Sequence, residues 1–577
     1  MEYYIEYLAM PPYTKFVVYA MATLSVIFLL YFINKVFREL GGLKFFIKSI
    51  FKKRTYYFLK EFLLHQRFFA TETLGGIAHS LTVIGLLISL IATIIVAFYQ
   101  YTGLTYGGPL FLAFRFLLDV AALSLIIGPV LGIYRIFRNR TKYNNLYNQY
   151  ILILIGFIII SITGIILQRF RVEYYFGGPT VWSPLSYIVP RPPLIVYEIS
   201  YFIHIIIAFT LLTIIPISIL KHMLIGYINY ISIDRPSGEL TTPFDLEKVL
   251  ESGQTDLKIG VGTKADLDIV HKIMPDACTR CSRCDDLCPA YAAGRPLSPR
   301  ALINKIAEAP SDKNIFEVGL SEDEVWACTT CGACMAVCPV YIRHIDYIVD
   351  LRRSLVFSSK IDQKKSDLLM SLSQYGNTLM QSNYGRHEWL RELGVKTVAE
   401  NPEFEYLLWV GCMGSFDNRA KQIIRSLIEI LREAKMLDKI AILGDEETCC
   451  GDPARRLGEE SRFQEIVLNN KNIFLKYNVK KIITICPHGY NTFKNEYRRF
   501  GVEIEVYHHS EFLAKLLEEN SIKIKSTSDV MTIHDPCYLA RHNKVVDPQR
   551  RIVVRIGQLR EPELSGDKTF CCGTRAN

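Results

Sequence analysis

The sequence predicts a multidomain protein that begins with an all-α membrane bundle, continues through a helical cysteine-rich segment and ends in an α/β domain. Two observations carry this prediction. Half of the 577 residues are hydrophobic, and the apolar excess is confined to the first 230 residues. All fifteen cysteines lie after that point, so the chemistry of the chain changes where we expect it to leave the membrane.

Residues 1–230 contain five apolar runs that can each cross a bilayer, since about 20 apolar residues span its hydrocarbon core. We expect five transmembrane helices at about 16–34, 74–98, 110–134, 149–168 and 194–220. Acidic Glu2 and Glu6 precede the first run, and no small-residue cleavage site follows it. We therefore expect this run to be a span and not a cleavable signal.

The distribution of Lys and Arg between the loops predicts the orientation, because cytoplasmic loops carry the excess. The loop after the first span is rich in basic residues from Lys35 to Arg67, and the loop after the third carries several from Arg135 to Lys142. The sequence thus predicts a multi-pass protein of the cell membrane, with its N-terminus outside and everything after residue 230 in the cytoplasm. These loops also account for most of the net charge of +9, so we expect no nucleic-acid partner.

Eight cysteines form two copies of the pattern Cys-x2-Cys-x2-Cys-x3-Cys-Pro, at 278–289 and 328–339. In two-cluster ferredoxins the first three cysteines of each copy bind one 4Fe-4S cluster, and the fourth binds the other cluster. A zinc ribbon needs four ligands in two pairs, which is a different spacing. We therefore expect an α-helical two-cluster ferredoxin domain whose ligand sets are Cys278, Cys281, Cys284 and Cys338, and Cys328, Cys331, Cys334 and Cys288.

The predicted membrane part contains four histidines, His65 and His79 at the second span and His204 and His222 at the fifth. On continuous helices, gaps of 14 and 18 residues bring each pair to nearly the same face. Ionisable side chains inside a bilayer are costly and usually functional. We expect the histidines to be axial ligands of haem b, although His65 and His222 could also be interfacial residues that reach the headgroups.

Two pairings of these histidines are possible. His65 with His222 and His79 with His204 would hold two haems, and we prefer this solution because the gaps correspond to about 21 and 27 Å along the helices. The depths of His79 and His204 do not match cleanly. The second solution pairs His79 with His222 and leaves one haem.

Three charged residues lie within the predicted spans near the depth of His204: Arg115, Asp119 and Glu198. Arg115 and Asp119 are four residues apart and can neutralise each other. Glu198 has no such neighbour and lies six residues before His204, about 9 Å along the helix. A membrane quinone needs a proton acceptor beside a haem, so we expect a quinone site here with Glu198 as its catalytic carboxylate.

After the membrane part we expect a linker over 231–275, the ferredoxin domain over 276–355, a helical connector over 356–400 and a cysteine-rich domain over 401–577. In the last domain, short apolar runs at 405–410, 440–443, 481–485 and 529–533 alternate with helical patterns. A cysteine follows each run: Cys412, Cys449 with Cys450, Cys486 and Cys537. A parallel sheet presents ligands beyond the carboxyl ends of its strands, so these cysteines are expected to meet. Free cysteines of the hydrophobic core are the simpler explanation, but an adjacent pair favours a cluster.

The arrangement Cys412-x36-Cys449-Cys450-Gly451-x34-Cys486, with a second set at Cys537, Cys571 and Cys572, resembles the two CCG repeats of the heterodisulfide reductase catalytic family. The segments ACTRCSRC and EETCCGDPARRLG are similar to that family too. The membrane part resembles the cytochrome b subunit of nitrate reductase through its histidines. The whole resembles membrane-bound iron-sulfur proteins that couple a quinone pool to cytoplasmic thiols or to electron transfer flavoprotein.

The sequence departs from the CCG pattern in two places. Gly489 stands where the first repeat of the family has its last cysteine, which leaves Cys412, Cys449, Cys450 and Cys486 as ligands and catalytic residues. His488 beside it is expected to support these residues from outside. The second repeat stops four residues after Gly573, so we expect one CCG cluster, with Cys537, Cys571 and Cys572 as further candidate ligands.

Together these features predict a membrane-bound iron-sulfur oxidoreductase that transfers electrons between the quinone pool and a cytoplasmic redox partner. The expected route is quinone, haem b, two 4Fe-4S clusters and the CCG cluster. The partner is either a thiol/disulfide carrier, as in heterodisulfide reductase, or electron transfer flavoprotein, for which the chain would act as a relay without its own thiol site.

Overall fold

The computed structural model describes residues 14–39, 66–69, 72–102, 108–138, 147–232, 235–254, 257 and 259–573. The chain divides into two compact units. We call Met1–Ile233, Ile269–Arg283 and Val337–Ile342 the membrane unit, and Asp234–Asp268, Cys284–Ala336 and Arg343–Asn577 the cysteine-rich unit. The boundary crosses the predicted ferredoxin domain three times, so two short cysteine-bearing segments fold with the membrane helices.

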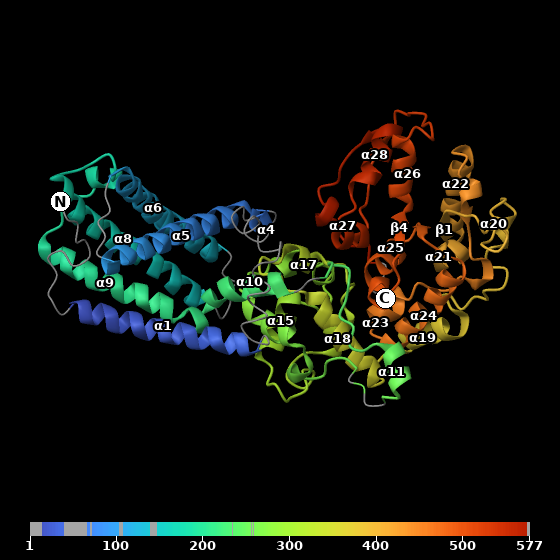
Figure 1. Cartoon of the computed structure of the whole chain (residues 1–577), viewed down its shortest axis with the longest axis horizontal. Helices are drawn as coiled ribbons and strands as arrows, with labels where there is room; N and C mark the ends of the chain where they lie inside the picture. The colour runs from blue at the N-terminus through green and yellow to red at the C-terminus, as the bar shows by residue number, and fades with distance from the viewer. Residues whose placement is uncertain are drawn as a thin grey trace. The chain divides into compact units, whose positions relative to one another are not determined.

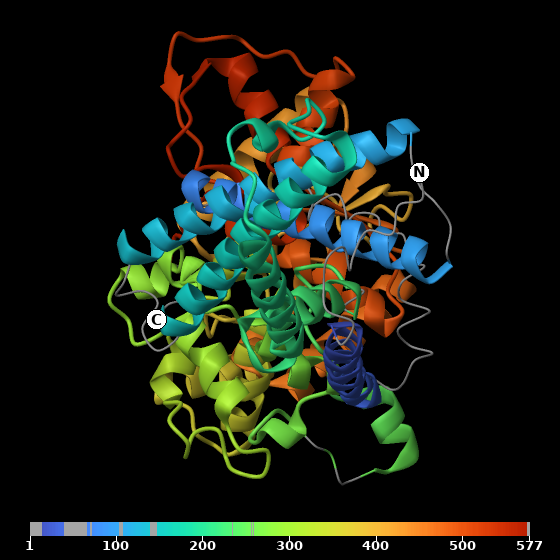
Figure 2. The ribbon, with the colours of Figure 1, turned by 90° about the vertical axis from the view of Figure 1, so that its left-hand side faces the viewer.

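Five helices of the membrane unit are long and apolar enough to cross a bilayer, among the residues that the structure describes. They are α1 (Thr14–Glu39), α5 (Thr73–Thr102), α6 (Gly108–Arg138), α8 (Tyr147–Phe176) and α9 (Leu194–Thr213). Helix α1 packs on α9, α9 on α8, α8 on α6 and α6 on α5, which forms the bundle in Figures 1 and 2. The predicted five-span bundle is confirmed.

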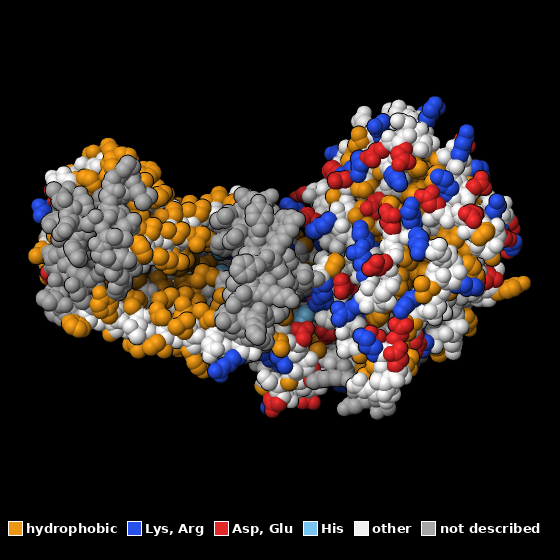
Figure 3. Space-filling view, in the orientation of Figure 1, with side chains coloured by type: hydrophobic (Ala, Val, Ile, Leu, Met, Phe, Trp, Pro, Cys, Tyr) orange, Lys and Arg blue, Asp and Glu red, His pale blue; other side chains and the backbone are white. Residues whose placement is uncertain are grey.

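The exterior of this bundle is apolar, as lipid contact requires. Phe16, Leu24 and Tyr31 of α1 are each more than two-thirds exposed. Figure 3 shows hydrophobic side chains over the coloured part of the membrane helices, whereas Lys, Arg, Asp and Glu are scattered over the visible face of the cysteine-rich unit. The surface of the membrane unit therefore suits lipid, whereas the surface of the cysteine-rich unit suits water.

Small residues allow α5 and α6 to approach closely. A Cβ atom added to Gly85 would lie 2.8 Å from the carbonyl oxygen of Ala121, and one added to Gly128 would lie 2.7 Å from the backbone nitrogen of Thr82. Glycine at such contacts is typical of membrane helix pairs, whose association depends on close van der Waals packing.

The fifth span is shorter than predicted. Helix α9 ends at Thr213 and two 3₁₀ turns follow, Ile215–Ile217 and Ile219–Lys221, before α10 (His222–Ser232) begins. Pro216 lies in the first turn, where it has no N–H to donate and its ring opposes continuation of the helix. The expectation of one helix over 194–220 was therefore wrong, and so was the helical phase that it implied between His204 and His222. His65 lies outside the described residues, and α5 begins only at Thr73.

Short helices surround the two cysteine motifs, as expected for an α-helical ferredoxin domain. They include α13 (Arg283–Asp286), α14 (Pro289–Ala292), α15 (Pro299–Glu308), α16 (Glu322–Trp326), α17 (Ala333–Val337) and α18 (His344–Phe357). Helix α15 starts where Ser298 accepts a hydrogen bond from the Ala301 N–H, and it buries Leu302 and Ile306. Helices α19 (Gln363–Tyr375) and α20 (Glu388–Arg391) follow.

A four-stranded parallel sheet organises the rest of this unit. Its strands are β1 (Tyr406–Trp409), β2 (Ile440–Ala441), β3 (Lys481–Thr484) and β4 (Glu505–His508), in the order β2-β1-β3-β4. Leu407 and Trp409 face one hydrophobic core, whereas Tyr406 and Leu408 face another, because side chains alternate along a strand. Both faces are covered by helices, mainly α22 (Asn418–Glu433), α24 (Glu460–Lys476) and α26 (His509–Glu518). The α/β prediction is confirmed.

The second repeat adds a smaller sheet of β5 (Val530–Met531) and β6 (Gln558–Leu559), which are also parallel. Helix α27 (Cys537–Asn543) and helix α28 (Asp547–Ile556) lie between these strands in the sequence, and α28 packs on α26. The predicted strand at 529–533 is thus reduced to two residues.

The predicted linker is packed into the cysteine-rich unit over part of its length. The guanidinium of Arg353 donates to the Thr241 hydroxyl over 2.9 Å and forms an ion pair of 2.7 Å with Glu460. Arg456 donates to the Gly238 carbonyl over 3.2 Å and pairs with Glu496 at 2.6 Å. Two arginines of nearly fully buried ion pairs therefore hydrogen-bond this stretch to α18 and to the helices of the sheet.

Candidate functional site

Three cysteines of the predicted first ligand set lie together in the membrane unit. Burial raises the pKa of the Cys278 thiol to about 12, and the neighbouring thiols of Cys281 and Cys338 raise it as well. Burial likewise raises the pKa of Cys338 to about 11, with Cys281 again beside it. The fourth cysteine of the second motif is thus found next to the first motif, as the exchange of ligands predicts. Cys284 belongs to the cysteine-rich unit, and its place in this set remains a prediction.

In the cysteine-rich unit, the fourth cysteine of the first motif in turn lies near the second motif. Burial raises the pKa of Cys288 to about 11, and Cys328 of the second motif lies near enough to raise it further. The Thr330 N–H donates to the Cys328 sulfur over 3.3 Å. The fourth cysteine of the first motif therefore lies beside the second motif, as the predicted ligand sets require.

The two cysteine loops have the same backbone conformation. Positive φ angles occur two and four residues after the first cysteine of each motif, at Arg280 and Ser282 and again at Thr330 and Gly332. Positive φ is uncommon in residues other than glycine. Its repetition curls each loop so that successive N–H groups converge, which is a concavity that binds anionic groups. This shape fits an iron-sulfur cluster held by thiolates.

The cysteines of the first CCG repeat meet near the carboxyl ends of β1, β2 and β3. Hydrogen bonding with Cys449 lowers the pKa of Cys412 to about 6. Cys450 is hydrogen-bonded to Cys449 and lies beside Cys486, whose pKa burial raises to about 12. Four sulfur atoms from three loops thus converge at one edge of the sheet, which suits a third cluster.

Residues that sequence reasoning missed hold these loops in place. Glu447 is fully buried and accepts hydrogen bonds from the Val410 and Gly411 N–H groups, over 3.0 and 2.8 Å. Burial raises the pKa of Glu447 to about 7, and its ion pair with Arg386 opposes that rise. Gly451 of the CCG triplet has a φ of 87°, and a Cβ atom there would lie 2.9 Å from Phe463. The adjacent acidic and glycine residues were visible in the sequence, but their contacts were not.

The cysteines of the second repeat lie against the second ferredoxin motif. Cys571 is hydrogen-bonded to both Cys331 and Cys537, and these bonds lower the pKa of the Cys571 thiol. Its sulfur is also 3.6 Å from the Thr329 hydroxyl oxygen. Cys572 lies near Cys537. Sequence spacing gave no sign that the second repeat would meet a ferredoxin loop.

Within the described ranges, no three His, Cys, Asp or Glu side chains are close enough to hold a single metal ion. A 4Fe-4S cluster occupies the space between its thiolates and separates them more widely than one ion does. The cysteine groups therefore suit clusters by their sulfur donors and loop shape.

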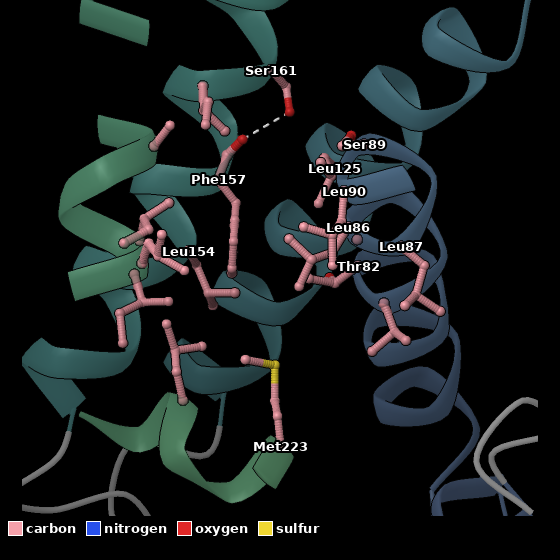
Figure 4. A pocket seen from close by; sticks show the side chains of 18 of the residues that line it. Thr82, Leu86, Leu87, Ser89, Leu90, Leu125, Leu154, Phe157, Ser161 and Met223 are labelled. Atoms are coloured by element: carbon pink, nitrogen blue, oxygen red, sulfur yellow. Dashed lines mark hydrogen bonds between the residues drawn. The ribbon is translucent and has the colours of Figure 1, made fainter. Parts of the chain in front are cut away.

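A cavity of 1310 Å³ lies inside the membrane unit. Ordinary small-molecule sites occupy roughly 300–1,000 Å³, so this space suits a large ligand. Figure 4 shows Leu86, Leu154 and Phe157 pointing into it. The lining also includes His79, His204 and His222, and at one end Thr279, Cys281 and Tyr341 of the cysteine-bearing segments.

Two histidines face each other across part of this cavity. The ring centres of His79 and His222 are 6.4 Å apart, with 52° between the ring planes. Two metal-imidazole bonds of roughly 2 Å, together with the distance from each ring centre to its nitrogen, account for a separation of this size. His222 Nδ1 donates to the Ile219 carbonyl over 2.6 Å, which leaves Nε2 for a metal. His79 thus lies opposite His222, as in the second pairing, whereas the pairing of His65 with His222 lies outside the described residues.

The ring of His204 is also oriented by a hydrogen bond at its Nδ1 atom. Its Nδ1 lies 3.0 Å from the Thr163 hydroxyl oxygen, and that hydroxyl donates to the Ile159 carbonyl over 2.9 Å. The hydroxyl must therefore accept from Nδ1–H, which leaves Nε2 of His204 unprotonated. The residues present fit a haem at His79 and His222, and His204 adds a further nitrogen donor to the same cavity.

Asp119 is held by neutral donors. Its carboxylate accepts from the Ser183 hydroxyl and the Leu185 N–H, both over 3.0 Å, and from the Gln168 amide over 3.1 Å. Arg115 donates to the oxygen of the same Gln168 side chain over 3.2 Å. Gln168 therefore hydrogen-bonds both charged residues that the sequence singled out, a role that their spacing did not reveal.

Glu198 does not join this group. The described residues that line the cavity include Asp119, Gln168 and His204 but not Glu198. Six residues at 100° each place Glu198 about 240° around α9 from His204, so the two side chains leave the helix on different faces. The short distance between Glu198 and His204 along the helix axis therefore did not place the Glu198 side chain in the cavity.

Comparisons with known proteins assign the chain to a family. The model of a 4Fe-4S dicluster domain matches residues 274–342, and that of a Cysteine-rich domain matches residues 406–494 and 531–576. The EtfAB:quinone oxidoreductase of Syntrophomonas wolfei is 32% identical over 570 residues, which cover 87% of this chain and 78% of that protein. The chain belongs to the family of this oxidoreductase.

Other relatives resemble the chain over shorter stretches. One subunit of the dihydromethanophenazine:CoB--CoM heterodisulfide reductase of Methanosarcina mazei is 30% identical over 334 residues, 53% of this chain and 80% of that protein. A probable membrane-anchored ferredoxin of Chromohalobacter salexigens is 32% identical over 362 residues, 56% of this chain and 54% of that protein. No solved structure matches the chain. The resemblance to heterodisulfide reductase is confirmed, and the chain is a membrane-bound oxidoreductase that carries iron-sulfur clusters.

Proposed function

We propose that this oxidoreductase transfers electrons between a membrane quinone and a redox partner in the cytoplasm. One observation carries the proposal: a single cavity in the membrane unit is lined by His79 and His222 and also by Cys281 of the first cysteine motif. A redox group in this cavity would lie beside a ligand of the first cluster. Electrons could then pass directly from the group in the cavity to the first cluster.

The group that best suits the cavity is haem b, which His79 and His222 would hold. Haem b, when bound, would supply one-electron redox chemistry between a two-electron quinone and the one-electron clusters. Ile219 would hold His222 in the tautomer that leaves Nε2 for iron. Arg67 and Arg135 line the same cavity and could balance the haem propionates. A second haem would require His204 and a partner for it.

Asp119 is our candidate for the proton acceptor of the quinone site, in place of Glu198. It lines the cavity and is 4% exposed. Quinol oxidation releases protons as well as electrons, and a buried carboxylate can take one. Three neutral donors hold its oxygen atoms in position beside the cavity.

The name of the relative from Syntrophomonas wolfei supports electron transfer flavoprotein as the cytoplasmic partner. That match covers 87% of the chain, whereas the match to the heterodisulfide reductase of Methanosarcina mazei covers 53%. Thiol/disulfide chemistry remains the second candidate because Cys412, Cys449, Cys450 and Cys486 converge as a catalytic group would. We retain the predicted orientation, with the N-terminus outside, on the basis of the basic loops.

Replacing Asp119 by Asn tests the quinone site. The change removes the carboxylate but keeps the shape of the side chain. We expect quinol-driven reduction of the haem to slow by ~100-fold, the usual contribution of a positioned acid or base. Haem content and reduction by dithionite should not change. Glu198→Gln is the matched control, since it removes a carboxylate that does not line the cavity. An unaltered quinol rate in Asp119→Asn would remove Asp119 from the mechanism.

A further inference from the structure

A tyrosine of the second repeat stands between the two cysteine groups of the cysteine-rich unit. Tyr538 directly follows Cys537 in α27 and is 1% exposed. One side of it contacts the ferredoxin loop, and the other contacts the first CCG repeat. The fold has therefore inserted one aromatic ring between segments that lie more than a hundred residues apart in the sequence.

On the ferredoxin side, the contact is a buried hydrogen bond. The hydroxyl oxygens of Tyr538 and Thr330 are 2.8 Å apart. Thr330 lies between Cys328 and Cys331, and its own N–H donates to the Cys328 sulfur over 3.3 Å. A single residue thus joins the tyrosine hydroxyl to a predicted ligand of the second 4Fe-4S cluster.

On the CCG side, the contact is aromatic. The ring centres of Tyr538 and His488 are 3.9 Å apart, and the planes differ by 39°. His488 follows Cys486 by two residues at the start of α25 (Pro487–Asn491). Its Nδ1 lies 3.2 Å from an oxygen of buried Asp452, which holds the imidazole against the tyrosine.

Neighbouring residues hold Tyr538 in this position. His542, one turn later in α27, lies 4.5 Å from the tyrosine ring, centre to centre, and its Nε2 is 3.1 Å from the Thr330 carbonyl oxygen. Arg541 donates to the Cys331 carbonyl over 2.8 Å. Helix α27 is therefore fastened to the ferredoxin loop by three of its side chains, and the ring has little freedom to move.

We propose that Tyr538 is the bridging residue through which an electron passes between the second ferredoxin cluster and the cluster of the first CCG repeat. One electron leaves one cluster and enters the other, while Tyr538 and His488 are neither oxidised nor reduced. The chain of contacts runs from Cys328 through Thr330, Tyr538 and His488 to Cys486. This inference rests on the proposed assignment of clusters to both cysteine groups.

The test removes the central contact from each side in the full-length, cluster-loaded protein. Tyr538→Phe deletes the tyrosine hydroxyl, and Thr330→Val deletes the threonine hydroxyl with little change of shape. Photoreduced deazaflavin delivers electrons without a quinone, and freeze-quench EPR follows their equilibration between the ferredoxin and CCG signals. We expect each variant to slow equilibration several-fold, and the double variant to be no slower than either, because both delete the same contact.

Two controls separate bridging from a general loss of structure. Thr330→Ser keeps the hydroxyl and should retain the rate of the parent protein. Tyr490→Phe changes another fully buried tyrosine, on the same helix as His488, whose ring lies near His508 instead. Iron content and the reduction potentials of the clusters should be the same in all variants. A structural role of Tyr538 would change these quantities, whereas bridging changes only the rate.

Three outcomes would overturn the proposal. Equilibration at the parent rate in Tyr538→Phe and Thr330→Val overturns it, as does an equal loss in Tyr490→Phe. If Tyr538→Phe loses iron, the comparison of Thr330→Val with Thr330→Ser still decides the question. Absence of a CCG signal in the parent protein would also overturn it. Failure of the quinone proposal would appear separately, as normal photoreduction without reduction by quinol.

Discussion

The membrane unit and the cysteine-rich unit hold the buried carboxylates of Asp119, Glu460 and Glu496 in different ways. In the membrane unit, the carboxylate of Asp119 is held by a serine hydroxyl, an amide side chain and a backbone N–H. In the cysteine-rich unit, the buried carboxylates of Glu460 and Glu496 pair with arginines at 2.5 to 2.9 Å. Asp119 thus accepts neutral hydrogen bonds, whereas these two carboxylates form full ion pairs. Ion pairs of the membrane unit, such as Arg169 with Glu173 at 2.8 Å, involve carboxylates that are less deeply buried.

This difference follows from what each unit has to hold together. Three of the four helix contacts in the membrane bundle join helices that follow one another in the sequence, and only α1 packs on a distant helix, α9. The interior of this bundle keeps a cavity open. The cysteine-rich unit joins segments that are over a hundred residues apart, and Arg353 links the stretch near Thr241 to Glu460. A buried ion pair adds little net stability, but losing one partner is very costly. The buried ion pairs therefore favour the one arrangement of the cysteine loops in which both partners of each pair meet.

The largest effect is expected at the open cavity. His222→Ala should abolish the haem held with His79, because the opposite histidine alone leaves one axial position without a protein ligand. Pyridine haemochrome analysis of the purified protein measures the content, and the iron-sulfur EPR signals should persist. His204→Ala is the companion variant: it should leave the content unchanged if there is one haem and halve it if there are two. Normal haem content in His222→Ala would disprove the axial assignment.

A smaller but still large effect is expected from breaking the ion-pair network. Glu460→Gln removes the shared partner of Arg353 and Arg455, and the free energy of unfolding of the cysteine-rich unit should fall by ~3–5 kcal/mol. Denaturant unfolding followed by loss of the cluster absorbance measures it. Glu247→Gln is the matched control, because Glu247 forms an exposed pair with Lys471 that is worth at most ~1 kcal/mol. Equal effects of the two changes would show that burial of the network is unimportant.

The smallest effect is expected from the neutral hydrogen bonds of the membrane unit. Ser183→Ala removes one of three donors to Asp119 and should lower stability by ~1 kcal/mol, since the other two remain. Thermal unfolding in detergent, followed by haem absorbance, measures the change. Thr93→Ala, which removes only a hydroxyl bonded to its own helix, provides the baseline. A loss as large as that of Glu460→Gln would contradict the distinction between the units.

The sequence by itself determined the features that depend on spacing and composition. Five apolar runs predicted the spans, and two repeated cysteine patterns predicted that Cys338 would lie beside Cys281 and Cys288 beside Cys328. Alternating apolar runs predicted the parallel sheet and the convergence of Cys412, Cys449, Cys450 and Cys486. These features are local, or are set by a pattern that permits one arrangement, so the order of residues is enough to derive them.

Only the tertiary structure decided which distant side chains meet. Pro216 ends the fifth span early, and the turns after it bring His222 opposite His79. Gln168 reaches Asp119 from 49 residues away, and Tyr538 reaches Thr330 from 208. Such contacts depend on how helices rotate and pack against one another, and no spacing rule relates residues on different elements. The sequence therefore determined which chemical groups are present and roughly where, while packing decided which of them act together.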